Sequence, residues 1–359
     1  MFQTENYNSF GDITSPIVNQ SALNKLDPQT GGHPLNFKAY IEGTTEKKYT
    51  PSMEKGDLFH AWLANKDNFV FAELDKPAGQ MSLFAEFFYE LYFREKWKTN
   101  EKFLEASKST FGIDMDSLLG VNRIYQSFYG VEGSTEQIQL LARLILFARK
   151  EAEVDKRLLD KTVYDKFEKD CIEYIRFLRD AGDRIIVTRD VKTTLINCSY
   201  SVRNNPLVKT ILDDTTYRIE KELYWDETWD GIVVKRKGIP DRFKINHENK
   251  IITVIDFKTT SYPVSLFPEG AFKKYKLARQ LYNYYFGICT MNNLHDYKPN
   301  LLNIVVQTNE NYPCSVYKVI NITSVQEDYS NIMTRLAAHI KSNRWDITVE
   351  EMLSGVIYI

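Results

Sequence analysis

Hydrophobic residues recur at three- and four-residue spacing along much of the first half of the chain. The spacing begins near Ser52 and is clearest between 80 and 180, in MSLFAEFFYELYFREKWK, TEQIQLLARLILFARKEAEVDKRLL and YDKFEKDCIEYIRFLRDAG. This is the period of an amphipathic α-helix, and Gly182 is a suitable residue to end the last of these helices. Residues 1–50 lack the period, so we expect mostly loops there, with turn-rich DPQTGGHP at 27–34.

The pattern changes after about residue 185, where short β-branched runs replace the helical spacing. RIIVT, KELYW, GIVVKRK, IITVIDF and LLNIVVQT each predict a strand. Amphipathic helices are expected over about 270–288 and 325–342. A helical first half followed by mixed strands and helices predicts an α/β fold of the mixed α+β kind. No proline- or glycine-rich linker is present, so we expect one domain over 1–359, made of an N-terminal part (1–80), a helical insertion (81–180) and a core (181–359).

The composition is that of an ordinary globular protein. The 359 residues include 46 Lys and Arg against 48 Asp and Glu, a formal net charge of −2, and 43% are hydrophobic. These values exclude collagen, coiled-coil and disordered chains, and they show no general basic excess. The four cysteines lie far apart without a CxxC pair, so neither a disulfide framework nor a clustered-cysteine metal site is expected. No signal-peptide pattern opens the chain and Arg143 interrupts the longest apolar run, so we expect a cytoplasmic protein without a membrane span.

Three charged side chains converge in the predicted hairpin GIPDRFKINHENKIITVIDFKTT. INHENK is polar and suits the turn between two apolar-rich strands. If Asn246 pairs with Ile251, Asp241 lies directly opposite Asp256, with their Cβ atoms about 4.5–5.5 Å apart. Alternate residues share a strand face, so Lys258 projects beside Asp256. The pattern therefore predicts two carboxylates and one ammonium together at the edge of a sheet.

Such a carboxylate pair favours a bound cation. Like charges this close repel unless a cation lies between them, and hard oxygen ligands suit Mg²⁺, which takes carboxylates plus substrate phosphates. Lys258 would then position or deprotonate a water molecule, or stabilise charge on a phosphate. The simpler alternative is a surface hairpin in which Asp256 and Lys258 form an ion pair on one face. The placement of Asp241 across the hairpin leads us to favour the metal site.

GIPDR followed by VIDFKTT resembles the PD-(D/E)xK nuclease motif. More narrowly it is similar to the RecB-type and exonuclease VIII-like branch, whose members often read G-x-x-D-R and then x-D-x-K-T-T. ARQLYNYYF resembles the Q-L-x-x-Y helix of that branch, with Gln280 and Tyr284 in its slots, and MEKGDLFHAWLA resembles its G-x-x-x-H helix, with His60 in the ligand slot. The resemblance covers about 35–80 and 185–346, whereas 80–180 has no counterpart.

The resemblance implies a restriction-endonuclease-like core, a central mixed β-sheet flanked by helices, and a Mg²⁺-dependent deoxyribonuclease activity in which Mn²⁺ can replace Mg²⁺. The metal ligands that it implies are His60, Asp241, Asp256 and the main-chain carbonyl of Phe257. Lys258 would activate the attacking water, and Gln280 and Tyr284 would hold the site or the scissile backbone. Some relatives also use an acidic residue on the preceding strand. The nearest candidate here is Glu222 in EKELYW, and the alternative is an exposed strand glutamate.

Basic charge is concentrated around the motif. Residues 231–279 contain eleven Lys and Arg against four Asp and Glu, a net charge of +7, so the rest of the chain carries −9. The predicted DNA contacts are the basic and aromatic residues near the motif, namely Arg242, Lys273, Lys276 and Tyr284. The last three recur with Gln280 at three- and four-residue spacing in the predicted helix, so they share one face. The alternatives are a solvated helix face for the lysines and a place at the core edge for Tyr284.

These features predict an exonuclease that degrades one strand from the ends of linear double-stranded DNA, in phage-type recombination or DNA processing. The resemblance further implies a single-strand annealing protein as partner and a ring-shaped homo-oligomer. Two alternatives remain: a non-catalytic DNA-binding or assembly module with the nuclease fold, and an endonuclease acting on branched DNA or RNA. The iron–sulfur nucleases of the same superfamily are disfavoured, because the chain lacks their clustered C-terminal cysteines.

Overall fold

The chain divides into two compact units. The structure is a computed structural model, and it describes residues 13, 15–45, 51–71, 76–106, 115–154, 160–187 and 189–350. Unit 1 takes Met1–Lys66 and Thr193–Ile359, and unit 2 takes Asp67–Lys192. Where the sequence predicted one domain with an insertion, the contacts group the segment containing that insertion into a unit of its own.

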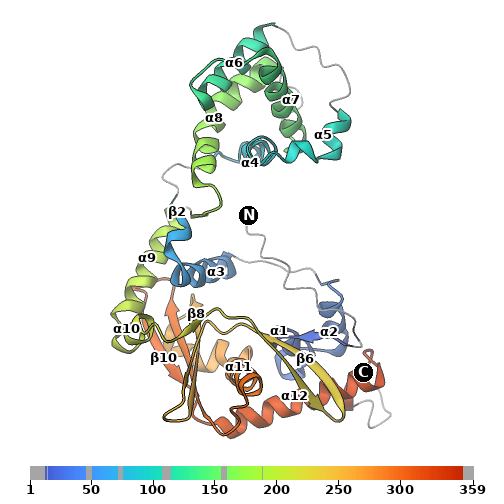
Figure 1. Ribbon diagram of the computed structural model, residues 1–359, viewed down its shortest axis with the longest axis vertical. Coiled ribbons are helices and arrows are strands. Elements are labelled where there is room, and N and C mark those ends of the chain that lie inside the picture. The colour runs from blue at the N-terminus through green and yellow to red at the C-terminus, as the bar shows by residue number, and fades with distance from the viewer. Residues whose placement is uncertain are drawn as a thin grey trace. The chain divides into compact units, whose positions relative to one another are not determined.

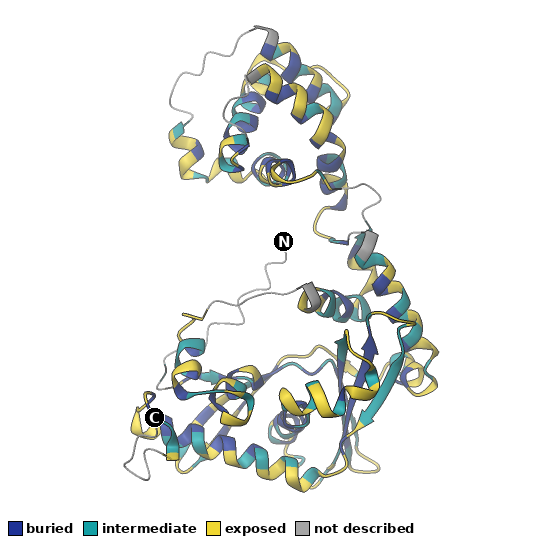
Figure 2. Cartoon of the chain, turned by 180° about the vertical axis from the view of Figure 1, so that it is seen from behind, coloured by how far each residue is buried: buried dark blue, intermediate teal, exposed yellow. Residues whose placement is uncertain are grey.

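A five-stranded mixed sheet forms the centre of unit 1, in the order β10-β9-β8-β7-β4 (Figure 1). Its strands are β4 (Arg218–Ile219), β7 (Arg242–Asn246), β8 (Ile251–Thr260), β9 (Lys298–Gln307) and β10 (Cys314–Lys318). Strand β8 runs antiparallel to β7 and parallel to β9. Figure 2 shows buried residues concentrated along these strands, which agrees with their apolar sequences. The mixed sheet with packed helices confirms the predicted α/β fold class.

The hairpin of β7 and β8 has the register that we assumed for it from the sequence. Asn246 pairs with Ile251, and the same register holds along all five residues of β7. The residue before β7 is Asp241, whose position in this register is opposite Asp256. Strand β8 is buried on both faces in its middle, so a shift of one residue would replace every contact that it makes.

The remaining strands of unit 1 form a three-stranded sheet in the order β1-β6-β5. They are β1 (Ile17–Val18), β5 (Leu223–Trp229) and β6 (Ile232–Gly238). The helices lying wholly or mostly in this unit are α1 (Gln20–Leu26), α2 (Pro34–Ile41), α3 (Pro51–Ala64), α9 (Arg189–Asn204), α10 (Pro206–Asp213), α11 (Leu277–Asn292) and α12 (Ile322–Ser342). Helix α11 packs against both sheets and against α12, so it is the central helix of the unit.

A buried arginine fixes α11 between two other helices. Arg279 Nη1 lies 2.6 Å from Asp27 Oδ2, at the end of α1, and 3.5 Å from Asp328 Oδ2 of α12. Arg279 Nη2 donates to Asn24 Oδ1 at 2.8 Å. Arg279 and Asp27 are both buried, and loss of one partner from a buried ion pair typically costs about 3–5 kcal/mol. The N-terminal segment is therefore tied to the centre of the unit.

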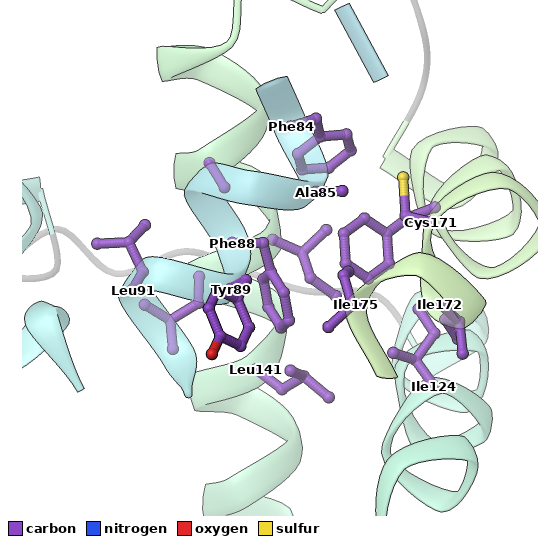
Figure 3. Packing of buried hydrophobic residues seen from close by; sticks show 14 of the residues in the cluster. Phe84, Ala85, Phe88, Tyr89, Leu91, Ile124, Leu141, Cys171, Ile172 and Ile175 are labelled. Carbon is purple, nitrogen blue, oxygen red and sulfur yellow. The ribbon is translucent and has the colours of Figure 1, made fainter. Parts of the chain in front are cut away.

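Unit 2 is a group of helices around its own apolar core. Its elements are α4 (Gln80–Tyr92), α5 (Glu101–Ala106), α6 (Met115–Tyr129), α7 (Thr135–Glu151), α8 (Asp160–Ala181) and the parallel pair β2 (Phe69–Phe71) and β3 (Ile185–Val187). Figure 3 shows Phe84 and Phe88 of α4 directed into this core, where each ring lies 4.9 Å from the ring of Phe167. The helices predicted over 80–180 are confirmed as α4, α7 and α8, but α7 ends at Glu151, and 155–159, the end of the second predicted segment, lie outside the described residues. Gly182, with a φ of +62°, follows the end of α8 as expected.

Short helical turns complete the described elements. Four are 3₁₀ helices, at Pro28–Thr30, Lys66–Asn68, Lys96–Lys98 and Val264–Leu266, and one is a π-helix at Pro268–Phe272. Within the described residues, no helix combines the length and the apolar character needed to cross a membrane.

Two predictions about secondary structure are wrong. The described part of 1–50 contains β1, α1 and α2 rather than mostly loop, and Asn19 caps α1 by accepting from the N–H of Ala22. The helix predicted over about 270–288 is confirmed as α11, but its predicted start is wrong. It begins at Leu277, because Lys276 has a φ of 52°, which an α-helix does not accommodate. Helices α9 and α10 were not predicted at all. The C-terminal helix is confirmed as α12.

Gly287 allows α11 to lie directly against the ring of Trp225 in β5. A Cβ at position 287 would lie 2.8 Å from two ring carbons of Trp225, well inside the usual 3.5–4.0 Å between carbon atoms. Trp225 is buried, and its Nε1 donates to Glu227 Oε1 at 2.6 Å, so the ring has little freedom to move. We predict that Gly287→Ala lowers the free energy of unfolding, measured by urea titration, by about 1–3 kcal/mol.

The matched control is Gly270→Ala, where nothing lies within 4 Å of the added Cβ. Its free energy of unfolding should change by no more than about 0.5 kcal/mol. Equal stability of the two variants would contradict the close approach of α11 to β5.

Candidate active site

Asp241 lies between helix α3 and strand β8. The N–H of Phe257 donates to Asp241 Oδ2 at 2.5 Å, and His60 Nδ1 lies 3.2 Å from Asp241 Oδ1. His60 reaches Asp241 from α3, which packs against β8. Gly56 permits this packing, since a Cβ there would already lie 3.0 Å from Thr259 Oγ1. The Gly-x-x-x-His spacing therefore brings His60 to the hairpin.

Asp256 is buried, and donors reach it from three elements. Lys258 Nζ, on the same face of β8, lies 2.7 Å from Asp256 Oδ2, so Lys258 projects beside Asp256 as predicted. Gln280 Nε2 of α11 donates to Asp256 Oδ1 at 3.5 Å and to Tyr284 Oη at 2.8 Å. Asn303 of β9 stands opposite Asp256 in the parallel register, and its Nδ2 donates to Asp256 Oδ2 at 3.4 Å. The structure thus brings Asp256, Lys258 and Gln280 together.

The charged groups of the site shift one another's pKa values. Burial raises the pKa of Asp256 above its ordinary value, and the charge of Asp241 adds to the rise while Lys258 opposes it. Burial would also raise the pKa of Asp241, but the charges of His60 and Lys258 outweigh burial and lower it. Burial would lower the pKa of Lys258, but the carboxylates of Asp256 and Asp241 outweigh it and raise that pKa. Lys258 therefore remains an ammonium beside two carboxylates.

A small cavity opens beside Asp241. Its volume is about 10 Å³, which is close to the room needed by one water molecule. The residues that line it are His60, Leu63, Ala64, Ile219, Glu220, Asp241, Arg242 and Phe257. Three of the four predicted metal ligands meet at this cavity, whereas Asp256 is not among its lining residues.

The donor set at the hairpin fits Mg²⁺. In the part of the chain that the structure describes, no three His, Cys, Asp or Glu side chains form a ligand group for a metal. Mg²⁺ does not require one, because it binds through one or two carboxylates and keeps water and substrate phosphates in its other positions. Asp241, Asp256 and the carbonyl of Phe257 supply such a set. His60 is paired with Asp241, and it could bind a metal only as the neutral imidazole.

Glu220, which the sequence did not single out, lies at the same cavity. Its N–H donates to the main-chain oxygen of Asp241 at 3.0 Å. Burial and the charge of Asp241 together raise the pKa of Glu220. The signal that could have found it is the pairing of Ile219 with Arg242, which sets residue 220 beside residue 241. A strand of two residues is too short to recognise in the sequence.

The structure does not bring Glu222, the predicted auxiliary acid, to the site. Its carboxylate accepts from Tyr224 Oη at 2.8 Å and from Lys237 Nζ at 3.2 Å, and neither partner lines the cavity beside Asp241. These contacts agree with the alternative of an exposed strand glutamate.

The two predicted DNA-binding lysines do not lie on one helical face with Gln280. Lys276 precedes α11, and its Nζ donates to Gln29 Oε1 at 2.5 Å and to Asp328 Oδ1 at 3.1 Å. Lys273 lies in a short helical stretch ahead of Lys276, where it is exposed and pairs with Glu269. The break in the helix at Lys276 therefore separates them.

Arg242 and Tyr284, the other predicted DNA contacts, are buried, with 6% and 7% of their surfaces exposed. Arg242 lines the cavity beside Asp241, where burial lowers its pKa. Tyr284 accepts from Gln280 and lines a second cavity of about 150 Å³, next to Lys237 and Gly238. Both side chains thus form walls of the site rather than free surface.

Comparison with known proteins does not assign the chain to a family. No family profile matches it, and no curated protein matches it. Among solved structures, it is similar to the crystal structure of a "Putative exonuclease" from Eubacterium rectale, with 8% identity and a TM-score of 0.44, over 100% of this chain and 95% of that one. The crystal structure of SSO0001 is similar over 70% of this chain and 89% of that one, with 13% identity and a TM-score of 0.25. Such distant similarity supports no functional argument, so the function must be argued from the site.

We predict that the pKa of His60, measured by NMR titration of its ring protons, lies above 6.5. Burial lowers this pKa, but the Asp241 carboxylate outweighs burial and raises it. Because the folded-state pKa is raised, the pair stabilises the fold fully below pH 6.5 and loses this effect as the pH rises through that pKa. The pKa of His60 should be lower in the Asp241→Asn variant than in the wild type. The His60 ring signal is assigned as the one that is missing from the spectrum of His60→Gln. An equal His60 pKa in the wild type and in Asp241→Asn would contradict the pairing of His60 with Asp241.

Proposed function

We propose that this chain is a Mg²⁺-dependent nuclease that degrades one strand from the ends of linear double-stranded DNA. The observation that carries the proposal is the ion pair of buried Asp256 with half-buried Lys258, beside Asp241, fixed by the register of β7, β8 and β9. Two carboxylates next to one ammonium suit metal-assisted hydrolysis of a phosphodiester. The preference for DNA ends rests on the similarity of the motif residues to the exonuclease VIII-like branch.

In this proposal Asp241, Asp256 and the Phe257 carbonyl would hold Mg²⁺, which when bound supplies Lewis acidity toward a phosphate oxygen. Lys258 Nζ would orient the attacking water and stabilise the negative charge that builds on the phosphate. Gln280 would restrain the Asp256 carboxylate from the side of α11. His60 would restrain Asp241 from the side of α3.

The distribution of charge supports a substrate rich in phosphate. Residues 231–279 carry +7 in a chain whose net charge is −2. Some of these cations are already paired, as in Lys244 with Asp214 and Lys250 with Asp296, whereas Lys235 and Lys274 are exposed. A local positive field of this kind attracts a polyanion toward the site while the rest of the chain repels it.

The decisive test compares linear and covalently closed circular duplex DNA, each incubated with Mg²⁺ or Mn²⁺. We expect the full-length protein to digest the linear DNA only, and 5′- and 3′-labelled ends to show which strand is degraded. Lys258→Ala should lower kcat by at least about 100-fold, because it removes charge stabilisation at the phosphate. The control Lys298→Ala changes an exposed lysine at the opposite end of the β8–β9 ladder and should keep normal activity.

Each other outcome has a definite meaning. Equal cutting of circles would replace the exonuclease proposal with an endonuclease, and cutting of RNA alone would replace the substrate. DNA binding in EDTA without hydrolysis at any metal concentration would establish a non-catalytic module. Full activity of Lys258→Ala would overturn the site itself.

Two glutamates that are close in sequence provide a matched test of the site's boundary. We predict that Glu220→Gln lowers kcat by about 10–100-fold, as expected for a group that supports the metal-binding side chains. Glu222→Gln should change kcat by less than about twofold, since Glu222 contacts Tyr224 and Lys237 instead. Steady-state kinetics on linear DNA measure both. The reverse order of effects would contradict the placement of Glu220 at the Asp241 cavity.

A further inference from the structure

Asn303 is a polar side chain in an otherwise apolar strand. It is completely buried, and its neighbours in β9 from Leu301 to Val306 are buried hydrophobic residues. An amide at such a position loses its hydration, and only good hydrogen bonds compensate for that loss. A leucine of similar size would suit the strand better.

The hydrogen bonds of Asn303 compensate poorly for the hydration that its amide loses on burial. Its Nδ2 lies 3.4 Å from Asp256 Oδ2 and 3.5 Å from the main-chain oxygen of Asp256, and both distances are at the long end for hydrogen bonds. Among the described residues, its Oδ1 has no hydrogen-bond partner. Stability of the fold therefore does not explain this amide.

What the amide does is restrain one carboxylate. Both contacts of Nδ2 are to Asp256, and the parallel register sets the two residues side by side. Gln280 approaches Oδ1 of the same carboxylate, while Lys258 and Asn303 approach Oδ2. A carboxylate with donors at both oxygens, from two neighbouring elements, has a fixed orientation.

We propose that Asn303 is a positioning residue, which holds the Asp256 carboxylate in the orientation needed for metal binding and for contact with Lys258. This inference rests on the proposed nuclease function. Asn303 itself would touch neither the substrate nor the metal. Its removal should therefore weaken metal binding and slow the reaction, without changing the binding of DNA.

The test is Asn303→Leu in the full-length chain. We expect an unchanged or higher melting temperature, because the unpartnered Oδ1 is removed from the core. Mg²⁺ and Mn²⁺ affinity, measured by calorimetry without DNA, should fall about 10–100-fold, and kcat on linear DNA should fall by a similar factor with an unchanged KM. Asn303→Asp, which keeps the shape of the side chain but loses the N–H donors, should show at least the same losses.

The matched control is Gln307→Leu. Gln307 is also a buried amide of β9, four residues further along the same strand face, but it donates to Asn309 Oδ1 at 2.8 Å and stands opposite Thr260. It should lose stability and keep the metal affinity and kcat of the wild type. The comparison of metal affinity and kcat between the two variants thus distinguishes a positioning role of Asn303 from a purely structural one.

Folded Asn303 variants with wild-type metal affinity and kcat would overturn the inference and leave the nuclease proposal intact. So would an Asn303→Leu protein that unfolds while Asn303→Asp folds and is fully active, because Asn303 would then be only structural. A wild-type protein that binds no metal and cleaves no DNA would overturn the nuclease proposal, and the inference with it.

Discussion

The pairing of β7 with β8 is the constraint on which the site depends. Asp241 and Asp256 are fifteen positions apart in the chain, and only this register sets them opposite each other. A slip of one residue would turn every side chain of β8 to the other face of the sheet. Asp256 and Lys258 would then turn away from Asp241 together, and the buried apolar residues of β8 would lose their contacts. The packing of the sheet and the geometry of the charges are therefore specified together.

Burying these charges destabilises the fold locally, and the surrounding elements limit that effect. Asp241 has the Phe257 N–H and His60, and Asp256 has Lys258, Gln280 and Asn303. An ion pair with one fully buried partner, as in Asp256 with Lys258, is not an efficient way to stabilise a protein, because desolvation of the carboxylate offsets most of the attraction. The arrangement is better explained as a preformed electrostatic environment for an incoming cation and phosphate. Four elements supply it, and none of them could do so alone.

The sequence predicted the features that depend on local pattern. The apolar runs on either side of INHENK were sufficient to place the hairpin, and the register assumed for it is the one that the structure has. The helical spacing over 80–180 was sufficient for the main helices of unit 2. The start of α11 was missed because Lys276 adopts a left-handed backbone conformation. Its side chain binds Gln29 and Asp328, which are far from it in the chain. Glu220 was missed because its position depends on a two-residue strand, β4, that carries no periodic signal. Contacts between segments far apart in the chain decided both cases.

The buried pair of Asp27 and Arg279 links the N-terminal segment to the helix that carries Gln280. Gln280 is the next residue after Arg279, so the segment around α1 helps to set where the amide meets Asp256. None of the recognisable nuclease motif lies in that segment. A chain shortened to the motif-bearing parts would keep every predicted catalytic side chain, yet buried Arg279 would lose Asp27 at 2.6 Å and keep only the more distant carboxylate of Asp328 at 3.5 Å. The part of this chain that the site needs is thus larger than the part that carries the nuclease motif. A buried ion pair, not sequence similarity, shows that the N-terminal segment belongs to it.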